Sequence, residues 1–327
     1  MFEEWGLLGS VLIMMVSLFI LDRASDIAID NAVKVSEITG LGKTTVGFIL
    51  IALVTTLPEL SVSVLAAFGK EGMGIAIGNV LGSNIVNIGL ILGAGILIAA
   101  MKSQDRLKMA PLLAEEEIGT LHFGLFIASM IPLLLIYVGY VSRFIGIILI
   151  GIFVYHVYRL SKTKTIREEG ALGGERARLK LYVFLTVTGA LMVVISANFL
   201  VDSAVLIATW LGVPQVVLGA TIVAFGTSLP EFANTIKASS KGHVELAMGN
   251  LIGSCFTNIT LILGVALIGS PLAVNMAAFT NLVVFSLITN LLLWYFLTSG
   301  RVSWREGVLL LFMYMIFLIA SFGGYRT

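Results

Sequence analysis

Long apolar stretches separated by short polar segments dominate the pattern of this chain. Most are at least as long as the roughly 20 residues that an α-helix needs to cross the hydrocarbon core of a bilayer. The period-two alternation of membrane barrel strands is not found. The pattern predicts an all-α membrane protein with ten transmembrane helices, at about 5–33, 44–69, 72–100, 111–139, 143–160, 179–208, 214–240, 243–270, 274–298 and 303–322.

The stretch from Val54 to Gly93 recurs near the end of the chain. Its segment V-T-T-L-P-E returns as G-T-S-L-P-E at an offset of 172 residues, and its segment G-N-V-L-G-S-N returns as G-N-L-I-G-S-C at an offset of 171. Asp30 pairs with Asp202 at the first of these offsets. The coincident offsets indicate that a half of five helices has been duplicated.

An odd number of helices in each half makes the second copy enter the membrane from the opposite side, which is the inverted-repeat plan of many transporters. We therefore divide the chain into a first repeat at 1–160, a linker at 161–178 and a second repeat at 179–327. The polar linker is too short for a folded regulatory domain.

The distribution of basic residues predicts the orientation. Segments on the side of the N-terminus hold Lys70, Arg143 and Arg326, whereas the other side holds sixteen lysines and arginines. Cytoplasmic loops carry the excess of positive charge. The chain should thus be a multi-pass protein of the cell membrane with both termini extracellular and the linker cytoplasmic.

Composition supports this class and excludes others. The chain is 58% hydrophobic and 12% charged, with a mean hydropathy of +1.03 and a net charge of +1. Scattered lysines and arginines make nucleic acid an improbable partner. The single cysteine, Cys255, excludes an internal disulfide. The lipid bilayer is the partner that we expect, and the sequence indicates no protein partner and no cofactor.

Two glutamates carry the candidate chemistry. Glu59 and Glu231 each lie about midway along an apolar stretch, where an unpaired carboxylate is costly and marks a functional site. The proline before each glutamate should kink the helix. We expect this kink to free the carbonyl groups of Ala52 and Ala224 or their neighbours.

Hydroxyl and amide side chains accompany both glutamates at repeated positions. Collected around a two-fold axis, they would form a cage of oxygen atoms. Such a cage suits hard cations such as Ca²⁺, whereas transition metals favour histidine or cysteine. The hydroxyl and amide residues are Thr55, Thr56, Ser83 and Asn87 in the first half, and Thr227, Ser228, Ser254 and Asn258 in the second. Asn79, Asn84 and Asn250 are instead expected to form hydrogen bonds between helices.

The paired T-[ST]-L-P-E and G-N-x-x-G-S motifs resemble the two alpha-repeats of the sodium/calcium exchanger family, and the resemblance, to its compact prokaryotic members, covers essentially the whole chain. It implies a midplane site of four cation positions, with Na⁺ and Ca²⁺ as the transported ions. The implied ligands are Ala52, Thr55, Thr56, Glu59, Ser83, Asn87, Ala224, Thr227, Ser228, Glu231, Ser254 and Asn258.

Departures from the family pattern refine the expected activity. Asn258 stands where potassium-dependent relatives carry aspartate, which disfavours K⁺ co-transport. The G-N-A-x-E context of proton/calcium exchangers is absent, which favours Na⁺ over H⁺. We therefore predict an electrogenic exchange of about three Na⁺ for one Ca²⁺, with H⁺/Ca²⁺ exchange as the alternative. An intramembrane enzyme and a channel remain rival classes, although protease motifs are absent.

Two features of the first and sixth helices stay open. Asp22, Arg23 and Asp26 have no assigned role. Small residues such as Gly9 and Gly189 suggest a surface over which these helices could slide against the rest of the bundle.

Overall fold

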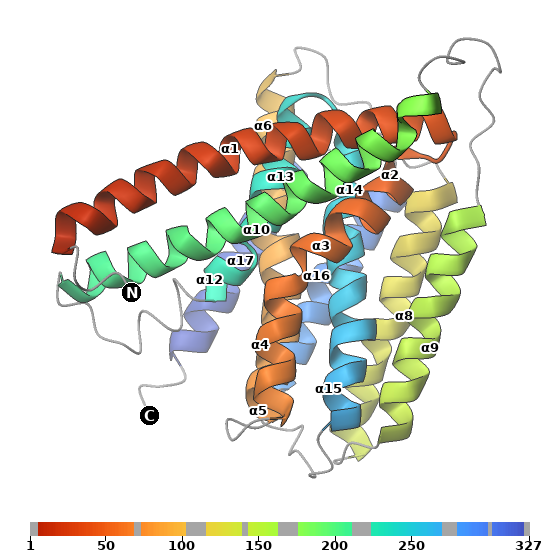
Figure 1. Cartoon of the computed structure of the whole chain (residues 1–327). Coiled ribbons are helices and arrows are strands. Elements are labelled where there is room, and N and C mark those ends of the chain that lie inside the picture. Colours follow the sequence, from red (N-terminus) through yellow and green to blue (C-terminus); the bar gives the residue numbers. More distant parts are fainter. Residues whose placement is uncertain are drawn as a thin grey trace.

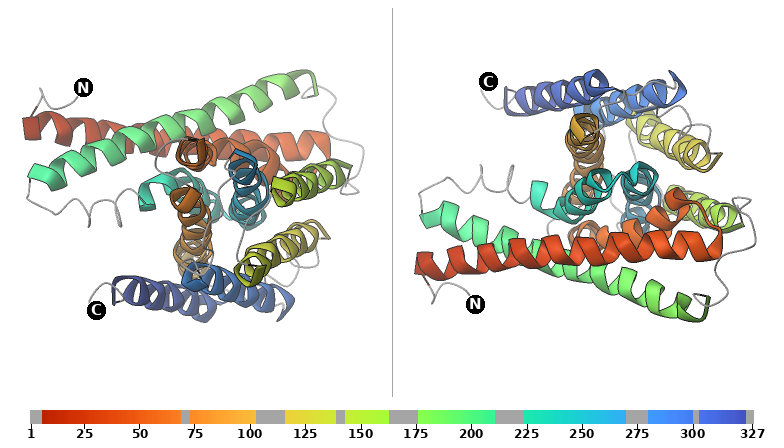
Figure 2. Two further views of the ribbon diagram at one scale, coloured as in Figure 1. Left: turned by 90° about the horizontal axis from the view of Figure 1, so that it is seen from below. Right: turned by 90° about the horizontal axis from the view of Figure 1, so that it is seen from above.

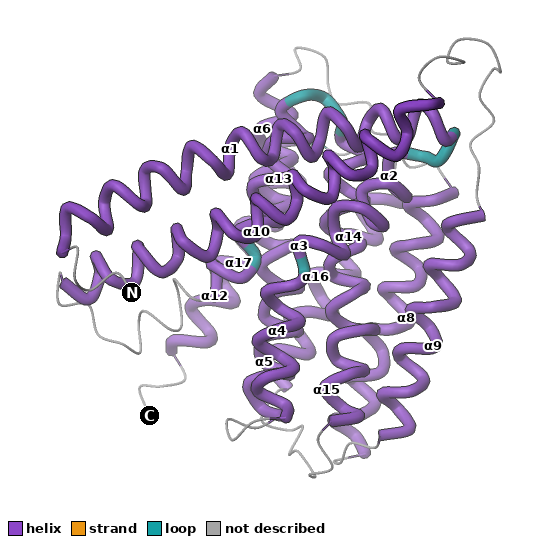
Figure 3. Tube along the Cα trace, in the orientation of Figure 1, coloured by secondary structure: helices purple, strands orange, loops and turns teal. Residues whose placement is uncertain are grey.

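The computed structural model describes residues 6–68, 73–102, 116–138, 143–162, 176–210, 224–269, 280–299 and 303–323, and these residues form helices and turns without a strand (Figure 1, Figure 3). The long helices are α1 (Gly6–Thr39), α8 (Glu116–Val138), α9 (Arg143–Lys162), α10 (Leu179–Trp210), α16 (Thr280–Ser299) and α17 (Trp304–Gly323). A 3₁₀ turn, η4 (Arg176–Arg178), precedes α10.

Other segments are built from several pieces. In the first half they are α2 (Lys43–Val46), η2 (Gly47–Ala52), α3 (Leu53–Thr55) and α4 (Leu57–Phe68), followed by α5 (Met73–Ile85), η3 (Val86–Leu92) and α6 (Gly93–Lys102). In the second half they are α12 (Ala224–Thr227) and α13 (Leu229–Ser240), followed by α14 (Val244–Thr257), η6 (Asn258–Ile262) and α15 (Leu263–Gly269).

The helices are arranged in three groups, which Figure 2 shows from two opposite sides. The antiparallel pair α1 and α10 lies along one side of the molecule, and α16 and α17 lie along the opposite side. The composite segments that contain both repeated motifs pass between these two groups. The residues predicted to hold cations are therefore placed in the centre of the bundle.

The observed helix ends agree with the ends predicted from the sequence, except for the end of the first helix. The sequence predicts that the first helix ends near residue 33, but α1 continues to Thr39. Gly40 then has φ of 70°, and Gly242 after α13 has φ of 78°. Glycine adopts this left-handed conformation at little cost, so it is the residue that ends these helices.

Close helix crossings relate the two halves. A Cβ built on Gly93 would lie 3.0 Å from the carbonyl oxygen of Gly307, and one built on Gly264 would lie 2.9 Å from that of Gly146. Gly93 and Gly264 are equivalent positions of the repeat. Each glycine therefore lets its own helix approach the last described helix of the other half. Helix α6 approaches α17, and α15 approaches α9.

The α1 and α10 pair corrects one expectation. A Cβ built on Gly189 of α10 would lie 2.8 Å from the backbone nitrogen of Ala28 and 3.0 Å from the carbonyl oxygen of Ala24, both in α1. The prediction that Gly189 faces the rest of the bundle is therefore wrong. This small residue joins α1 and α10 to each other, so that the two helices form one closely packed unit.

Within the described residues, six helices are long and apolar enough to cross a membrane, or up to seven if one bent pair counts as a single span. Apolar side chains such as Leu12, Phe19 and Phe184 are exposed on α1 and α10, as expected for surfaces that contact lipid. Several predicted features lie outside the described residues, namely 163–175 of the linker, 111–115, 214–223 and 274–279.

Candidate cation-binding site

Both helices that carry the glutamates are interrupted just before the proline. Thr56 has φ and ψ of −78° and 3°, and the equivalent Ser228 has −90° and 8°. The segments Lys43–Thr55 and Leu57–Val64 are bent by 46°. The predicted kinks are confirmed, and each glutamate lies in the first turn of the helix that follows the break.

The two glutamates are bridged across the halves of the chain. Both side chains are fully buried, at 0% exposure. The Ser228 hydroxyl donates a hydrogen bond to Oε1 of Glu59 over 3.2 Å, and the Thr55 hydroxyl of the first half donates one to Glu231. The fold thus brings both carboxylates and the interrupted helices of both halves to one centre.

Side chains of the neighbouring helices complete this centre. Ser254 of α14 donates to Oε1 of Glu231 over 3.3 Å. Ser83, its equivalent in α5, is 3% exposed, and Asn87 and Asn258 are 0% exposed. Thr227 is partly buried beside the break that contains Ser228.

Two further asparagines hold the helices in register, as the sequence indicated. Asn79 Nδ2 donates to the backbone oxygen of Glu59 over 3.1 Å and to the Ser63 hydroxyl over 2.9 Å. Asn250 Nδ2 makes the equivalent bonds to the backbone oxygen of Glu231 and to Thr235, over 3.3 and 3.1 Å. The backbone at both glutamates is therefore held by equivalent bonds in the two halves.

Three π-helical segments surround the centre, and sequence reasoning missed all of them. Ala52 ends η2, Asn87 lies in η3 and Asn258 begins η6. A π-helical turn widens the helix, disturbs its regular hydrogen bonding and is frequent at functional sites. The segments η3 and η6 occupy equivalent positions of the repeat, so this distortion belongs to both halves.

The expected freeing of the Ala52 carbonyl is wrong. Its oxygen accepts the backbone N–H of Thr56 over 3.0 Å and the Thr56 hydroxyl over 2.9 Å. The reason is that Thr56, four residues after Ala52, keeps its backbone N–H, so this carbonyl retains its regular helical bond. The donor that Pro58 lacks would have bonded the carbonyl of Val54. The side chain of Ala224, its equivalent, lies outside the described residues.

Uncompensated oxygen atoms define the chemistry of the centre. Oε2 of Glu59, Oε2 of Glu231 and the Oδ1 atoms of Asn87 and Asn258 have no hydrogen-bond donor among the described residues. Neither glutamate takes part in any of the ion pairs that these residues form. A buried, unpaired carboxylate is strongly unfavourable, so these oxygen atoms are suited to a cation.

Two more asparagines lie near the centre, of which the sequence indicated Asn84 as a bond between helices but gave no signal for Asn234. Asn84 accepts a hydrogen bond from Asn258 Nδ2 and donates one to the backbone oxygen of Cys255, both over 3.2 Å. Asn234, one turn after Glu231, is fully buried, and neither atom of its amide has a partner among the described residues. Its equivalent in the first half is Val62, so the repeat did not point to it.

Comparison with known proteins identifies the family. The family described as "Sodium/calcium exchanger protein" matches residues 9–162 and 181–323. The chain belongs to the sodium/calcium exchanger family. This membership confirms the resemblance seen in the sequence and the assignment to multi-pass membrane transporters, and it shows that the chain is not an enzyme.

Relatives of this exchanger match it over nearly their whole length. Sodium/calcium exchanger MaX1 of Methanosarcina acetivorans is 30% identical over 95% of this chain and 98% of its own. Putative antiporter CaxA of Alkalimonas amylolytica is 32% identical over 83% of this chain and 84% of its own. The solved structure of the sodium-calcium exchanger NCX_Mj, soaked with 10 mM Na⁺ and zero Ca²⁺, is 27% identical with a TM-score of 0.78, over 94% and 97% of the two chains.

Proposed function

We propose that this exchanger moves Ca²⁺ against Na⁺ through the centre formed by Glu59 and Glu231. The observation that carries the proposal is the pair of buried carboxylates, each bridged by a hydroxyl of the other half and each left with one uncompensated oxygen. The ligands that we assign are those predicted by the resemblance. Similarity to MaX1 and to NCX_Mj supports Na⁺ and Ca²⁺ as the ions.

Charge balance gives the expected electrical behaviour. Two carboxylates neutralise one Ca²⁺, whereas three Na⁺ leave one positive charge. With three Na⁺ exchanged for one Ca²⁺, each cycle moves net charge. Because Asn87 and Asn258 are neutral, the centre has no third carboxylate for an additional K⁺, and exchange should not require K⁺.

We infer that ten helices cross the membrane as two inverted repeats, 1–160 and 179–327, with both termini extracellular and the linker 161–178 cytoplasmic. Equivalent breaks at Thr56 and Ser228, and equivalent close crossings at Gly93 and Gly264, support this division. Inverted repeats around one central site allow it to open to each side in turn.

Uptake of ⁴⁵Ca²⁺ into proteoliposomes tests the function. Vesicles loaded with Na⁺ are diluted into Na⁺, K⁺ or choline, with and without a pH gradient. We expect uptake that needs internal Na⁺, is abolished by external Na⁺ and is equal in K⁺ and choline. Uptake driven by the pH gradient alone would instead establish H⁺/Ca²⁺ exchange, and Ca²⁺ flux without any counter-ion would indicate a channel.

A further inference from the structure

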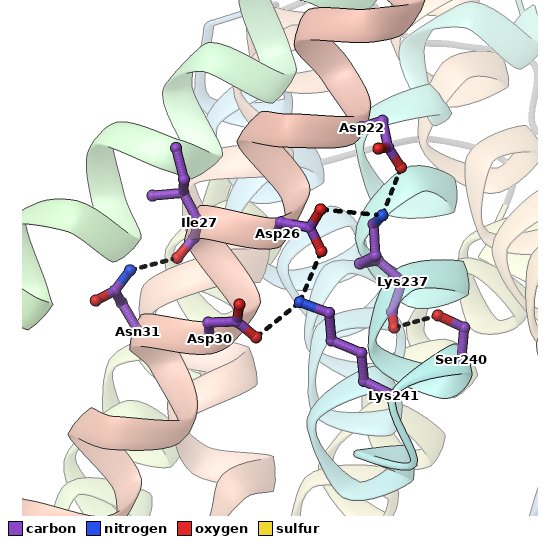
Figure 4. Close-up of polar contacts among 8 residues, drawn as sticks. All are labelled: Asp22, Asp26, Ile27, Asp30, Asn31, Lys237, Ser240 and Lys241. Atoms are coloured by element: carbon purple, nitrogen blue, oxygen red, sulfur yellow. Dashed lines mark hydrogen bonds and ion pairs between the residues drawn. The ribbon is translucent and has the colours of Figure 1, made fainter.

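A ladder of ion pairs joins α1 to α13 (Figure 4). Lys237 Nζ lies 2.5 Å from Asp22 and 3.3 Å from Asp26, and Lys241 Nζ lies 2.6 Å from Asp26 and 2.7 Å from Asp30. The sequence left Asp22 and Asp26 without a role and counted Lys237 only among the basic residues of the cytoplasmic side. The structure places Lys237 within α13, six residues after Glu231.

The charges of the ladder are mutually dependent. Burial alone would lower the pKa of Lys241, but hydrogen bonds and negative charges from Asp26 and Asp30 outweigh it and raise the pKa above its ordinary value. The side chains are partly accessible, from 19% for Lys237 to 56% for Asp30. Such contacts are individually weak and reversible, which suits a connection that must open during transport.

Three charges of the ladder have no charged equivalent in the other half. Positions of α10 equivalent to Asp22 and Asp26 are Val194 and Asn198, and the position equivalent to Lys237 is Leu65. Closely packed α1 and α10 form one unit, as the contact of Gly189 shows. The ladder is therefore an ionic connection of this unit to the helix that carries Glu231, and the contacts of Lys237 have no equivalent in the other half.

The spacing of the charges has a geometric consequence. Aspartates recur every four residues on α1, and Lys237 of the parallel α13 is followed four residues later by Lys241, which caps the end of that helix. Four residues correspond to about 6 Å along a helix axis. Consider a shift of α1 by four residues toward its own C-terminus. Lys241 would then contact Asp22 and Asp26. Lys237 would contact Asp22 and the uncharged Leu18. Three of the four attractive contacts would form again.

A shift in the opposite direction is less favourable. It would bring Lys34, the residue four positions after Asp30, against Lys241. Like charges at this distance repel. The column Leu18, Asp22, Asp26, Asp30 and Lys34 thus gives the ladder a preferred direction.

We propose that Lys237 and Lys241 are positioning residues of the exchange cycle, which hold the α1 and α10 unit in one of two registers against α13 that differ by one helical turn. This proposal rests on the alternating access proposed above. Elements that move past one another by about one turn are known in switching proteins. The ladder favours the observed register by one contact.

Two matched variants make the proposal testable. Asp22 and Asp30 are equally exposed, at 55% and 56%, and each makes one contact in the observed register. In the shifted register Asp22 would make two contacts and Asp30 none. Asp22→Asn should therefore favour the observed register, and Asp30→Asn the shifted one. A static scaffold would respond to both changes in the same way.

Spin labels report the register independently of transport. They are placed at exposed Glu37 of α1 and exposed Val154 of α9, in the full-length protein with Cys255→Ala, and distances are measured in liposomes without Na⁺ or Ca²⁺. We expect two distance populations, with a ratio that moves about two- to fivefold in opposite directions for Asp22→Asn and Asp30→Asn, the size expected of one weak ion-pair contact. Lys241→Met, which removes two contacts from each register, should leave the ratio within about twofold.

Lys237→Met should shift the ratio in the same direction as Asp30→Asn. It removes two contacts from the observed register and only one from the shifted register. Shifts of the same sign for Asp22→Asn and either of these variants, or a single unchanging distance, would overturn the proposal. Opposite shifts in a protein whose Ca²⁺ flux does not depend on Na⁺ would support the ladder and refute the proposed function instead.

Discussion

Replacing either central glutamate by glutamine should remove Ca²⁺ exchange while the protein still folds. Glutamine keeps the shape of Glu59 or Glu231 and removes one of the two charges. Coulomb's law with an effective dielectric constant of about 20 gives about 11 kcal/mol of gross attraction between Ca²⁺ and a carboxylate about 3 Å away.

The net loss is smaller, because water lost from both groups offsets most of this attraction. Removing one partner of a buried charge pair costs about 3 to 5 kcal/mol. At about 1.4 kcal/mol for each factor of ten, Ca²⁺ affinity should fall from about 100-fold to several thousandfold. Na⁺ carries half the charge, and its binding should fall less.

Folding stability provides a second, independent measurement. Without cations, both carboxylates are buried and unpaired among the described residues, so Glu59→Gln should unfold at the same or a higher temperature than the parent protein. Added Ca²⁺ should raise the unfolding temperature of the parent and not of the variant, because a ligand stabilises only the state that binds it.

Calcium binding to purified protein and ⁴⁵Ca²⁺ uptake into Na⁺-loaded proteoliposomes measure the effect. Glu37→Gln is the matched control, since Glu37 lies on the exposed side of α1 and its loss should change neither quantity. Near-normal Ca²⁺ exchange by either central variant would show that these carboxylates do not form the site.

Three further changes have expected outcomes. External K⁺ should be dispensable, and Asn258→Asp should strengthen cation binding; an absolute requirement for K⁺ in uptake assays would contradict the first expectation. Ser228→Ala removes the hydroxyl bonded to Glu59 and should weaken Ca²⁺ binding by about 10- to 150-fold, since such bonds to charged groups contribute about 1.5 to 3 kcal/mol; unchanged binding in titrations would mean that this bond is absent when Ca²⁺ is bound. Gly249→Ala should lower unfolding stability by about 1 to 3 kcal/mol, because its Cβ would lie against the carbonyl of Thr44; the control is Gly151→Ala, where no described atom lies within 4 Å, and equal melting of the two variants would contradict the reasoning.

The sequence predicted the parts of the site whose cause is local. Proline removes a backbone donor wherever it stands in a helix, so the breaks before Glu59 and Glu231 could be located without a structure. The sequence also predicted that Asn79 and Asn250 form hydrogen bonds between helices, because a polar amide in an apolar span needs a partner nearby.

What depends on the packing of distant segments could not be predicted. The repeat shows that Ser228 and Thr56 are equivalent, but not that Ser228 would reach across to Glu59. The π-helical segments at Asn87 and Asn258 have no distinct sequence pattern. Similarly, the four-residue spacing of the aspartates on α1 is visible in the sequence, whereas their pairing with Lys237 depends on how α1 lies against α13.

Differences between the halves bear on the direction of transport. Two identical inverted halves would make the two end states of the cycle mirror each other, with equal free energies in the absence of gradients. The ladder of Asp22, Asp26 and Lys237 is replaced by Val194, Asn198 and Leu65 in the other half. With the two registers proposed above, one end state therefore has one ionic contact more than the other. Because the cation centre itself is nearly symmetric, this peripheral connection is the feature that can set the resting orientation without changing which ions bind.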